Sequence, residues 1–222
     1  MEKKNNFIKM VVSSVLCLLP VIFALMVYND LPERIVMQWN LEGNPNWDAP
    51  KAVAAFGLPV FFLLLNIFTK TVVNNDLKKQ NISKAMRVFM DWLMPFLSLT
   101  LVPIILFMAL GKNIPIVFIT FIFIGLFFIL IGNYLPKNRQ NNLAGIRISW
   151  TLNDPDNWNK THRLTGFLFI CGGIFVIIMS FLTLSTFSAA MIILSIIAIL
   201  VIIPVKYSYF LYKKGKNSKK NG

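Results

Sequence analysis

The sequence predicts an all-α integral membrane protein with six transmembrane helices and both termini in the cytoplasm. Of its 222 residues, 56% are hydrophobic and 14% are charged. A soluble domain of this length needs more charge to cover its surface. Six apolar runs of about 17 to 22 residues follow one another, and each is long enough to cross a hydrocarbon core of about 30 Å. The basic residues cluster at the ends of these runs, as topology signals do.

The apolar runs extend over residues 8–28, 52–68, 92–110, 115–135, 164–183 and 189–209. The first follows a lysine-rich beginning of the chain, with Lys3, Lys4 and Lys9, and resembles a signal peptide. It is longer than a usual signal sequence, and no small-residue cleavage site follows it before Asp30. We therefore expect it to be retained as the first span, with Pro20 tolerated inside it as a kink.

The orientation follows from the distribution of lysine and arginine. With the N-terminus in the cytoplasm, 19 basic residues lie on the cytoplasmic side, and only Arg34, Lys51 and Lys112 lie outside. This asymmetry predicts an even number of spans, with both ends inside. The net charge of +13 is thus explained by topology. We predict no direct contact with nucleic acid.

The polar segments divide the chain into predicted parts. Residues 1–70 form a two-span unit whose extracellular loop covers residues 29–50. Residues 71–90 form a basic cytoplasmic loop. Residues 91–212 form a four-span unit with a long cytoplasmic loop at residues 133–164, and residues 213–222 form a basic tail.

The extracellular loop contains a candidate recognition surface. Residues 35–39 have the composition of a strand, and residues 40–45 are rich in turn formers, with Gly43 able to adopt a positive φ. Trp39 and Trp47 are compatible with two roles, as anchors at the membrane interface or as contacts of an ordered recognition loop. We favour the ordered loop. Its candidate contacts are Trp39, Asn40, Gly43, Trp47 and Asp48.

The cytoplasmic loop 133–164 contains a helix signal. Asp154 is suited to cap a helix that begins at Pro155, and Trp158 and His162 then share one face. We expect a short helix that lies in the membrane interface before the span beginning at Leu164. The loop's cations, among them Arg147, are compatible with binding of anionic headgroups or with docking of a cytoplasmic protein.

No catalytic or metal-binding pattern accompanies these loops. His162 is the only histidine, and it has no nucleophile or second carboxylate beside it, so we expect a hydrogen-bonded structural role in preference to catalysis or partner contact. Cys17 and Cys171 lie in apolar runs and are expected to be free thiols. We predict no enzyme, no metal and no cofactor. No ionisable residue clearly lies at the middle of a span, which argues against a proton-coupled transporter.

Two sets of residues carry a resemblance to known membrane families. The segment Gly132-Asn133-Tyr134-Leu135-Pro136, with Gly145-Ile146-Arg147, Trp150-Thr151-Leu152 and Lys160-Thr161-His162-Arg163, resembles the SdpI family of immunity proteins for the sporulation delay toxin of bacilli. Leu31-Pro32, Trp39-Asn40, Gly43 and Lys51 resemble a small membrane domain of unknown function that often precedes this motif. Gln38 stands where that pattern has histidine.

The resemblance implies a multi-pass protein of the bacterial cell membrane that protects its producer from a secreted peptide toxin. It also implies signalling through a cytoplasmic repressor held at the membrane. The extracellular candidates would then face the toxin, and residues 91–212 form an SdpI-like unit. The alternative is a small transporter or channel-like protein. The cytoplasmic motif residues implied by the resemblance are Asn133, Pro136, Asn141, Gly145, Arg147, Trp150, Thr151, Trp158, Lys160, Thr161, His162, Arg163 and Gly166.

Overall fold

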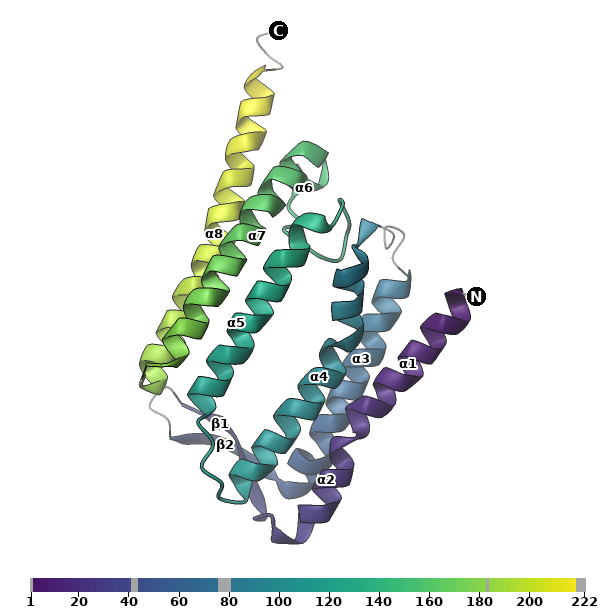
Figure 1. The fold of residues 1–222 in the computed structure, drawn as a ribbon, viewed down its shortest axis with the longest axis vertical. Helices are drawn as coiled ribbons and strands as arrows, with labels where there is room; N and C mark the ends of the chain where they lie inside the picture. Colours follow the sequence, from purple (N-terminus) through teal and green to yellow (C-terminus); the bar gives the residue numbers. More distant parts are fainter. Residues whose placement is uncertain (1, 41–43, 76–80, 183, 219–222) are drawn as a thin grey trace. The chain divides into compact units, whose positions relative to one another are not determined.

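The computed structural model describes residues 2–40, 44–75, 81–182 and 184–218. In these ranges six helices are long and apolar enough to cross a membrane, which confirms the predicted fold class (Figure 1). The chain forms two compact units. Unit 1 contains Met1–Asn75 and Arg87–Pro115, and unit 2 contains Asp76–Met86 and Ile116–Gly222.

The first span of unit 1 is interrupted at the predicted proline. Helix α1 (Glu2–Leu18) ends before Pro20, and α2 (Pro20–Val27) begins there. Because proline has no N–H group, the helical hydrogen-bond ladder cannot continue through it. At the junction the Leu19 N–H donates to the Leu16 carbonyl over 3.3 Å, and the Ile22 N–H donates to the Leu19 carbonyl over 3.0 Å. A short 3-10 helix, η1 (Tyr28–Asp30), follows.

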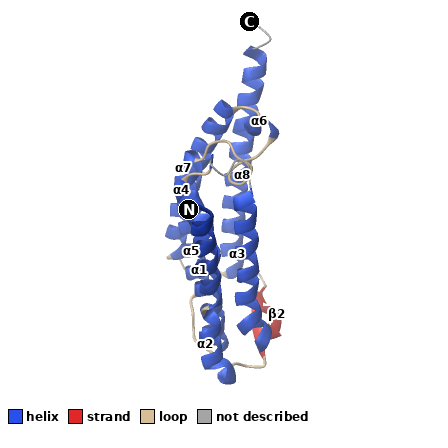
Figure 2. Cartoon of the chain, turned by 90° about the vertical axis from the view of Figure 1, so that its right-hand side faces the viewer, coloured by secondary structure: helices blue, strands red, loops and turns tan. Residues whose placement is uncertain are grey.

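The predicted extracellular loop of unit 1 forms a β-hairpin. Strand β1 (Arg34–Trp39) pairs with β2 (Pro45–Pro50) in an antiparallel sheet, with Ile35 opposite Ala49. Figure 2 shows the strands as the red element in an otherwise helical chain. Ile35 and Ala49 are each 2% exposed, and Ile35 joins the apolar core of the unit. The hairpin is therefore anchored by one face and presents the other to solvent.

The remaining helices of unit 1 are longer than the apolar runs. A π-helical turn, η2 (Val53–Gly57), leads into α3 (Leu58–Asn75), and α4 (Lys84–Ala109) provides the rest of the unit from Arg87 onward. The apolar run over residues 52–68 is extended in the structure, because α3 continues through Lys70 to Asn75. Most of α4 belongs to unit 1 together with the N-terminal helices. The predicted division of the chain by a loop at residues 71–90 stays a prediction.

Unit 2 is built around helix α7 (Pro155–Ser180), which packs against α5 (Ile116–Tyr134) and α8 (Thr186–Ser218). A 3-10 turn, η4 (Leu135–Lys137), and the short helix α6 (Ser149–Leu152) lie in the segment between α5 and α7. Helix α8 continues through most of the predicted basic tail. The prediction of a separate interfacial helix after Asp154 is wrong, because α7 is one continuous helix from Pro155 to Ser180.

Glycines set the distance between α5 and α7. A methyl group on Gly132 would lie 2.6 Å from the Gly166 carbonyl oxygen, and one on Gly125 would lie 2.7 Å from the Gly173 carbonyl oxygen. The two pairs are seven residues apart on each helix. Small residues at such positions let backbones approach closely where lipid removes the hydrophobic driving force between helices. Helices α5 and α7 therefore meet backbone to backbone.

Candidate functional site

The motif segment, residues 133–166, folds back on the beginning of α7. The Trp158 Nε1–H donates to the Asn138 carbonyl over 3.0 Å, and the Asn138 Oδ1 atom accepts the Ser83 N–H over 2.8 Å. Both Trp158 and Asn138 are buried. The Trp158 side chain is therefore directed into the unit, where its indole N–H has a carbonyl partner.

A tight turn at Asn141 directs the chain towards His162. The Asn141 Oδ1 atom accepts the N–H groups of Leu143 and Ala144 over 2.9 and 2.8 Å. Gly145 follows with φ +127°, a conformation that L residues rarely adopt, and its Cα faces the His162 ring so closely that a Cβ would overlap the Nε2 atom. A glycine is therefore required here by both backbone conformation and space.

Both ring nitrogens of His162 are occupied. Nε2 accepts the Ile146 N–H over 3.0 Å, so Nδ1 carries the proton and lies 2.8 Å from the Trp158 carbonyl. The imidazole stacks on the Trp158 ring with centroids 3.9 Å apart, and its exposed fraction is zero. The predicted hydrogen-bonded role is confirmed, and neither nitrogen is left to act as a base.

A second polar cluster joins α7 to α8. Asn157 donates from Nδ2 to the Ser208 carbonyl over 3.0 Å and accepts the Ser208 hydroxyl over 2.7 Å. Its Oδ1 atom also accepts the Thr161 hydroxyl over 2.9 Å. Trp150 from α6 packs against Tyr209 and Tyr212 of α8, with ring centroids 5.5 and 5.9 Å apart. These contacts attach the motif segment to α8.

The hydroxyl of Thr151 closes α6 against the preceding chain. It donates to the Ile146 carbonyl over 2.7 Å and accepts the Ile148 N–H over 3.1 Å.

The predicted N-cap of α7 is confirmed, since the Asp154 carboxylate accepts the N–H groups of Asp156 and Asn157 over 2.9 and 3.2 Å. The buried motif residues thus form the fold of this segment.

The remaining motif side chains point outward. Those exposed to solvent are Asn133, Pro136, Arg147, Lys160 and Arg163. Lys160 pairs with Asp156 over 2.7 Å, and Arg147 donates to the Asn142 carbonyl. This exposed set is the part of the motif that a partner or a lipid can reach.

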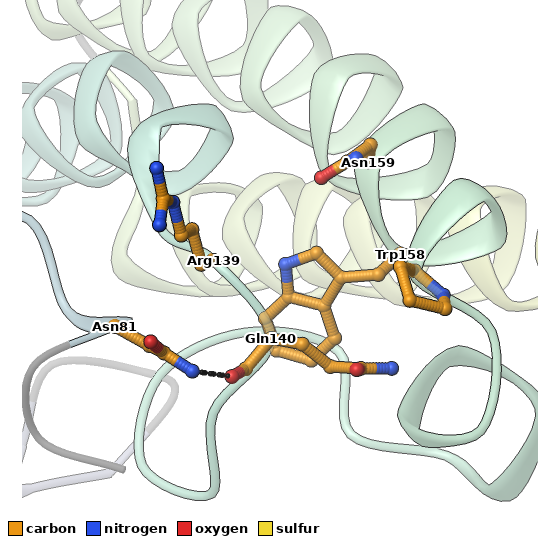
Figure 3. A pocket seen from close by; sticks show the side chains of 6 residues that line it. Asn81, Arg139, Gln140, Trp158 and Asn159 are labelled. Carbon is orange, nitrogen blue, oxygen red and sulfur yellow. Dashed lines mark hydrogen bonds between the residues drawn. The ribbon is translucent and has the colours of Figure 1, made fainter.

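A partly open cavity of about 380 Å³ adjoins the motif segment. Its lining residues are Asn81, Arg139, Gln140, Pro155, Trp158 and Asn159 (Figure 3). The Asn81 side chain donates to the Gln140 carbonyl over 2.7 Å, and the Asn81 carbonyl accepts the Arg139 N–H over 2.9 Å. Two backbone segments are therefore joined at the rim, and the Arg139 side chain is solvent-exposed.

The hairpin of unit 1 presents a different surface. Trp47 is 55% exposed, whereas Trp39 is half-buried. Arg34 and Asp48 form an exposed ion pair at 2.5 Å, and the hydrogen bond from Arg34 lowers the pKa of the Asp48 carboxyl below its ordinary value. The Asn40 Oδ1 atom accepts the Asn44 N–H over 2.8 Å, while Gly43 lies outside the described residues.

Sequence reasoning missed a buried ionic cluster in unit 1. Lys70 is 4% exposed, and its Nζ atom donates to the Lys9 carbonyl over 3.2 Å and lies 3.8 Å from Asp91. One turn earlier on α3, the Asn66 Nδ2 group donates to the Ser13 hydroxyl over 2.9 Å. The spacing of Asn66 and Lys70 by four residues was the available signal, because it places both on one helix face. In the described ranges, no group of three metal-ligating side chains occurs.

Comparison with known proteins gives two family matches. Residues 137–208 match the SdpI/YfhL protein family, and residues 15–63 match a domain of unknown function, DUF1648. The chain is 29% identical over 212 residues to the immunity protein SdpI of Bacillus subtilis (strain 168), which covers 95% of this chain and 99% of the relative. No solved structure matches the chain. Residues 137–208 are therefore similar to the SdpI/YfhL family, and these similarities, together with the six apolar helices, indicate a multi-pass protein of the bacterial cell membrane.

Proposed function

We propose that this protein is a membrane immunity protein that protects its producer from a secreted peptide toxin by binding it, without turnover. The observation that carries this proposal is its similarity to an immunity protein over nearly the full length of both chains. The saturated hydrogen bonding of His162, the only histidine, supports binding over catalysis. The proposed binding partners are a secreted peptide toxin and a cytoplasmic repressor.

The proposed topology places the hairpin outside the cell and the motif segment, with both termini, in the cytoplasm. It is supported by the 19-to-3 distribution of basic residues. Reporter fusions near Asn44 should give an extracellular signal, and fusions near Asn141 and Asn217 should give cytoplasmic signals. A cytoplasmic signal at Asn44 would overturn the topology.

The hairpin is the proposed toxin-facing surface, with Trp39, Asn40, Gly43, Trp47 and Asp48 as candidate contacts. Trp47 is the strongest of these, since a large exposed aromatic side chain on an ordered strand can anchor a peptide at low entropic cost. The exposed motif residues Arg147, Lys160 and Arg163 are the proposed contacts of a cytoplasmic repressor. The two surfaces then have separate roles.

The test is survival of cells that express the protein when they are exposed to candidate secreted peptides. Wild-type protein should raise survival, and toxin should bind to membranes that contain it. Trp47→Ala should reduce both at matched expression. Arg163→Ala should leave toxin binding unchanged and weaken only capture of a cytoplasmic partner. If no secreted peptide distinguishes cells with and without the protein, the immunity function is wrong.

Transport is the second candidate, and one observation favours it. Lys70 and Asp91 form a buried ionic contact on segments long and apolar enough to span the bilayer, and intramembrane ionisable residues often mark substrate or ion pathways. Purified protein in liposomes should bind the toxin yet move neither toxin nor protons. Flux that disappears in Lys70→Met would favour transport over binding.

A further inference from the structure

We propose that the cavity beside the motif segment binds the phosphate group of an anionic phospholipid. The site consists of the cavity bounded by Arg139, Trp158 and Asn159, with Asn81 and Gln140 at its rim (Figure 3). This proposal is independent of the toxin-binding function. It rests on the chemistry of the lining and on its position at the ends of two spans.

The lining offers hydrogen-bond donors without a competing acidic partner. Within the described ranges, the Arg139 guanidinium and the Asn159 amide have no side-chain partner, while the Asn81 and Gln140 amides donate to backbone carbonyls. A guanidinium presents two parallel N–H groups that match phosphate oxygens. The nearest helix-capping carboxylate, that of Asp154, already accepts two backbone N–H groups. The lining side chains can therefore donate hydrogen bonds to an anion, and none of them is a carboxylate that would repel it.

The indole of Trp158 gives the cavity a fixed wall. Its Nε1–H is held by the Asn138 carbonyl, and its ring stacks on His162, so the side chain is pinned on two sides. Proline at the beginning of α7 adds a second rigid and apolar surface. Because Trp158 is fully buried, its ring supports the cavity from behind, and the exposed ring of Pro155 is the apolar surface that can contact the glycerol portion of a lipid.

The position of the cavity selects a lipid over a soluble phosphate compound. The candidate spans formed by α5 and α7 end at Lys137 and begin at Pro155, and the lining residues lie within about one turn of these ends. In the proposed topology these ends lie at the cytoplasmic boundary of the bilayer, where headgroup phosphates lie. The exposed cation Lys137 at the end of the span formed by α5 adds attraction for anionic lipid at this boundary.

The test uses the full-length protein in neutral detergent, with phosphatidylglycerol added as the probe and bound lipid counted by native mass spectrometry. Wild-type protein should retain one phosphatidylglycerol in preference to phosphatidylcholine. Arg139→Gln should weaken its binding about tenfold, the loss of a bidentate charge-assisted contact. Asn159→Ala should weaken it roughly threefold. Arg163→Gln, which removes an exposed cation outside the lining, should change it less than about twofold.

Three outcomes would overturn the proposal. If Arg139→Gln and Arg163→Gln weaken phosphatidylglycerol binding equally, the lipid is attracted by positive charge in general and not by this cavity. Full displacement of the lipid by millimolar inorganic phosphate would assign the cavity to a free phosphate compound. If lipid binding is unchanged in both Arg139→Gln and Asn159→Ala, the cavity is not the lipid-binding site.

Thermal unfolding of each variant should match that of wild type, because the side chains of Arg139 and Asn159 are both exposed.

Discussion

The hairpin of unit 1 and the motif segment of unit 2 are both polar connections between spans, yet they use their polar side chains in opposite ways. In the motif segment, His162, Trp158 and Asn157 are at most 2% exposed and bond to carbonyls or to one another. In the hairpin, the ion pair Arg34–Asp48 is exposed, and Trp47 lies in solvent.

This difference separates folding from recognition. Removing a buried, bonded side chain leaves its partners unsatisfied in the interior, so the stability of the fold should fall. Removing an exposed side chain leaves no such defect, so only contacts with other molecules should suffer. A motif that defines a family by its sequence can thus be a structural element, while the contact surface lies in a less distinctive loop.

The largest effect is expected for Gly145→Ala, which combines a disfavoured φ with overlap against His162. We expect unit 2 to be destabilised by about 3 kcal/mol. The measurement is thermal unfolding in detergent followed by size-exclusion chromatography. Gly111→Ala is the matched control, because Gly111 also has a positive φ, +76°, but nothing within 4 Å of its Cβ position.

The control decides the origin of the effect. If Gly111→Ala and Gly145→Ala destabilise equally, backbone strain explains the result and the close approach to His162 does not contribute. A His162→Ala background should relieve part of the Gly145→Ala defect, since it removes the overlapping ring.

The next effect is expected for Asn157→Ala, which breaks the polar link between α7 and α8. The Ser208 hydroxyl and carbonyl lose their partner in the interior, which costs roughly 2 kcal/mol. A double-mutant cycle with Ser208→Ala should show coupling of about 1 kcal/mol or more. Additive losses would mean that the two side chains do not depend on each other.

Trp47→Ala should have the opposite profile to Asn157→Ala. Because Trp47 is 55% exposed, the unfolding temperature should not change. Affinity for the proposed toxin should fall about tenfold, equivalent to 1.4 kcal/mol. Trp47→Phe should keep most of the affinity. A loss of unfolding temperature with unchanged affinity would mean that Trp47 supports the fold.

The smallest effect concerns pH and the hairpin's ion pair. The bond from Arg34 lowers the folded pKa of Asp48, so its contribution to hairpin stability is present above the unfolded value of about 4 and is lost as pH falls through the folded pKa. Hydrogen exchange of residues 31–50 in wild type should approach that of Asp48→Asn as pH is lowered. If hydrogen exchange of wild type still differs from that of Asp48→Asn at pH 2, titration of Asp48 is not the cause of the difference.

Local signals in the sequence were sufficient for the six spans, one helix cap and the first strand of the hairpin. The Asp154-Pro155 pair predicted the start of α7, and the composition of residues 35–39 predicted β1. These features depend on neighbours within a few residues. The apolar runs predicted six spans because lipid requires continuous helices of a fixed minimum length.

Non-local contacts explain the errors. The second apolar run was predicted to end before Lys70, yet Asp91 and the Lys9 carbonyl, from distant parts of the chain, compensate this lysine inside α3. The burial of Trp158 also depends on a distant residue, because the Asn138 carbonyl accepts its indole N–H inside unit 2. The contact of Gly145 with His162 depends on the path of the intervening segment, which no periodicity encodes.

The glycine pairs between α5 and α7 also limit how these helices can change in length during evolution or engineering. One inserted residue turns all later positions by about 100°. An insertion between Gly125 and Gly132 would leave one of the two glycines facing away and bring a larger side chain against the Gly166 or Gly173 carbonyl. Seven inserted residues would nearly restore the facing of both glycines but add about 10 Å to the span. These two helices can therefore be lengthened or shortened only beyond their glycines.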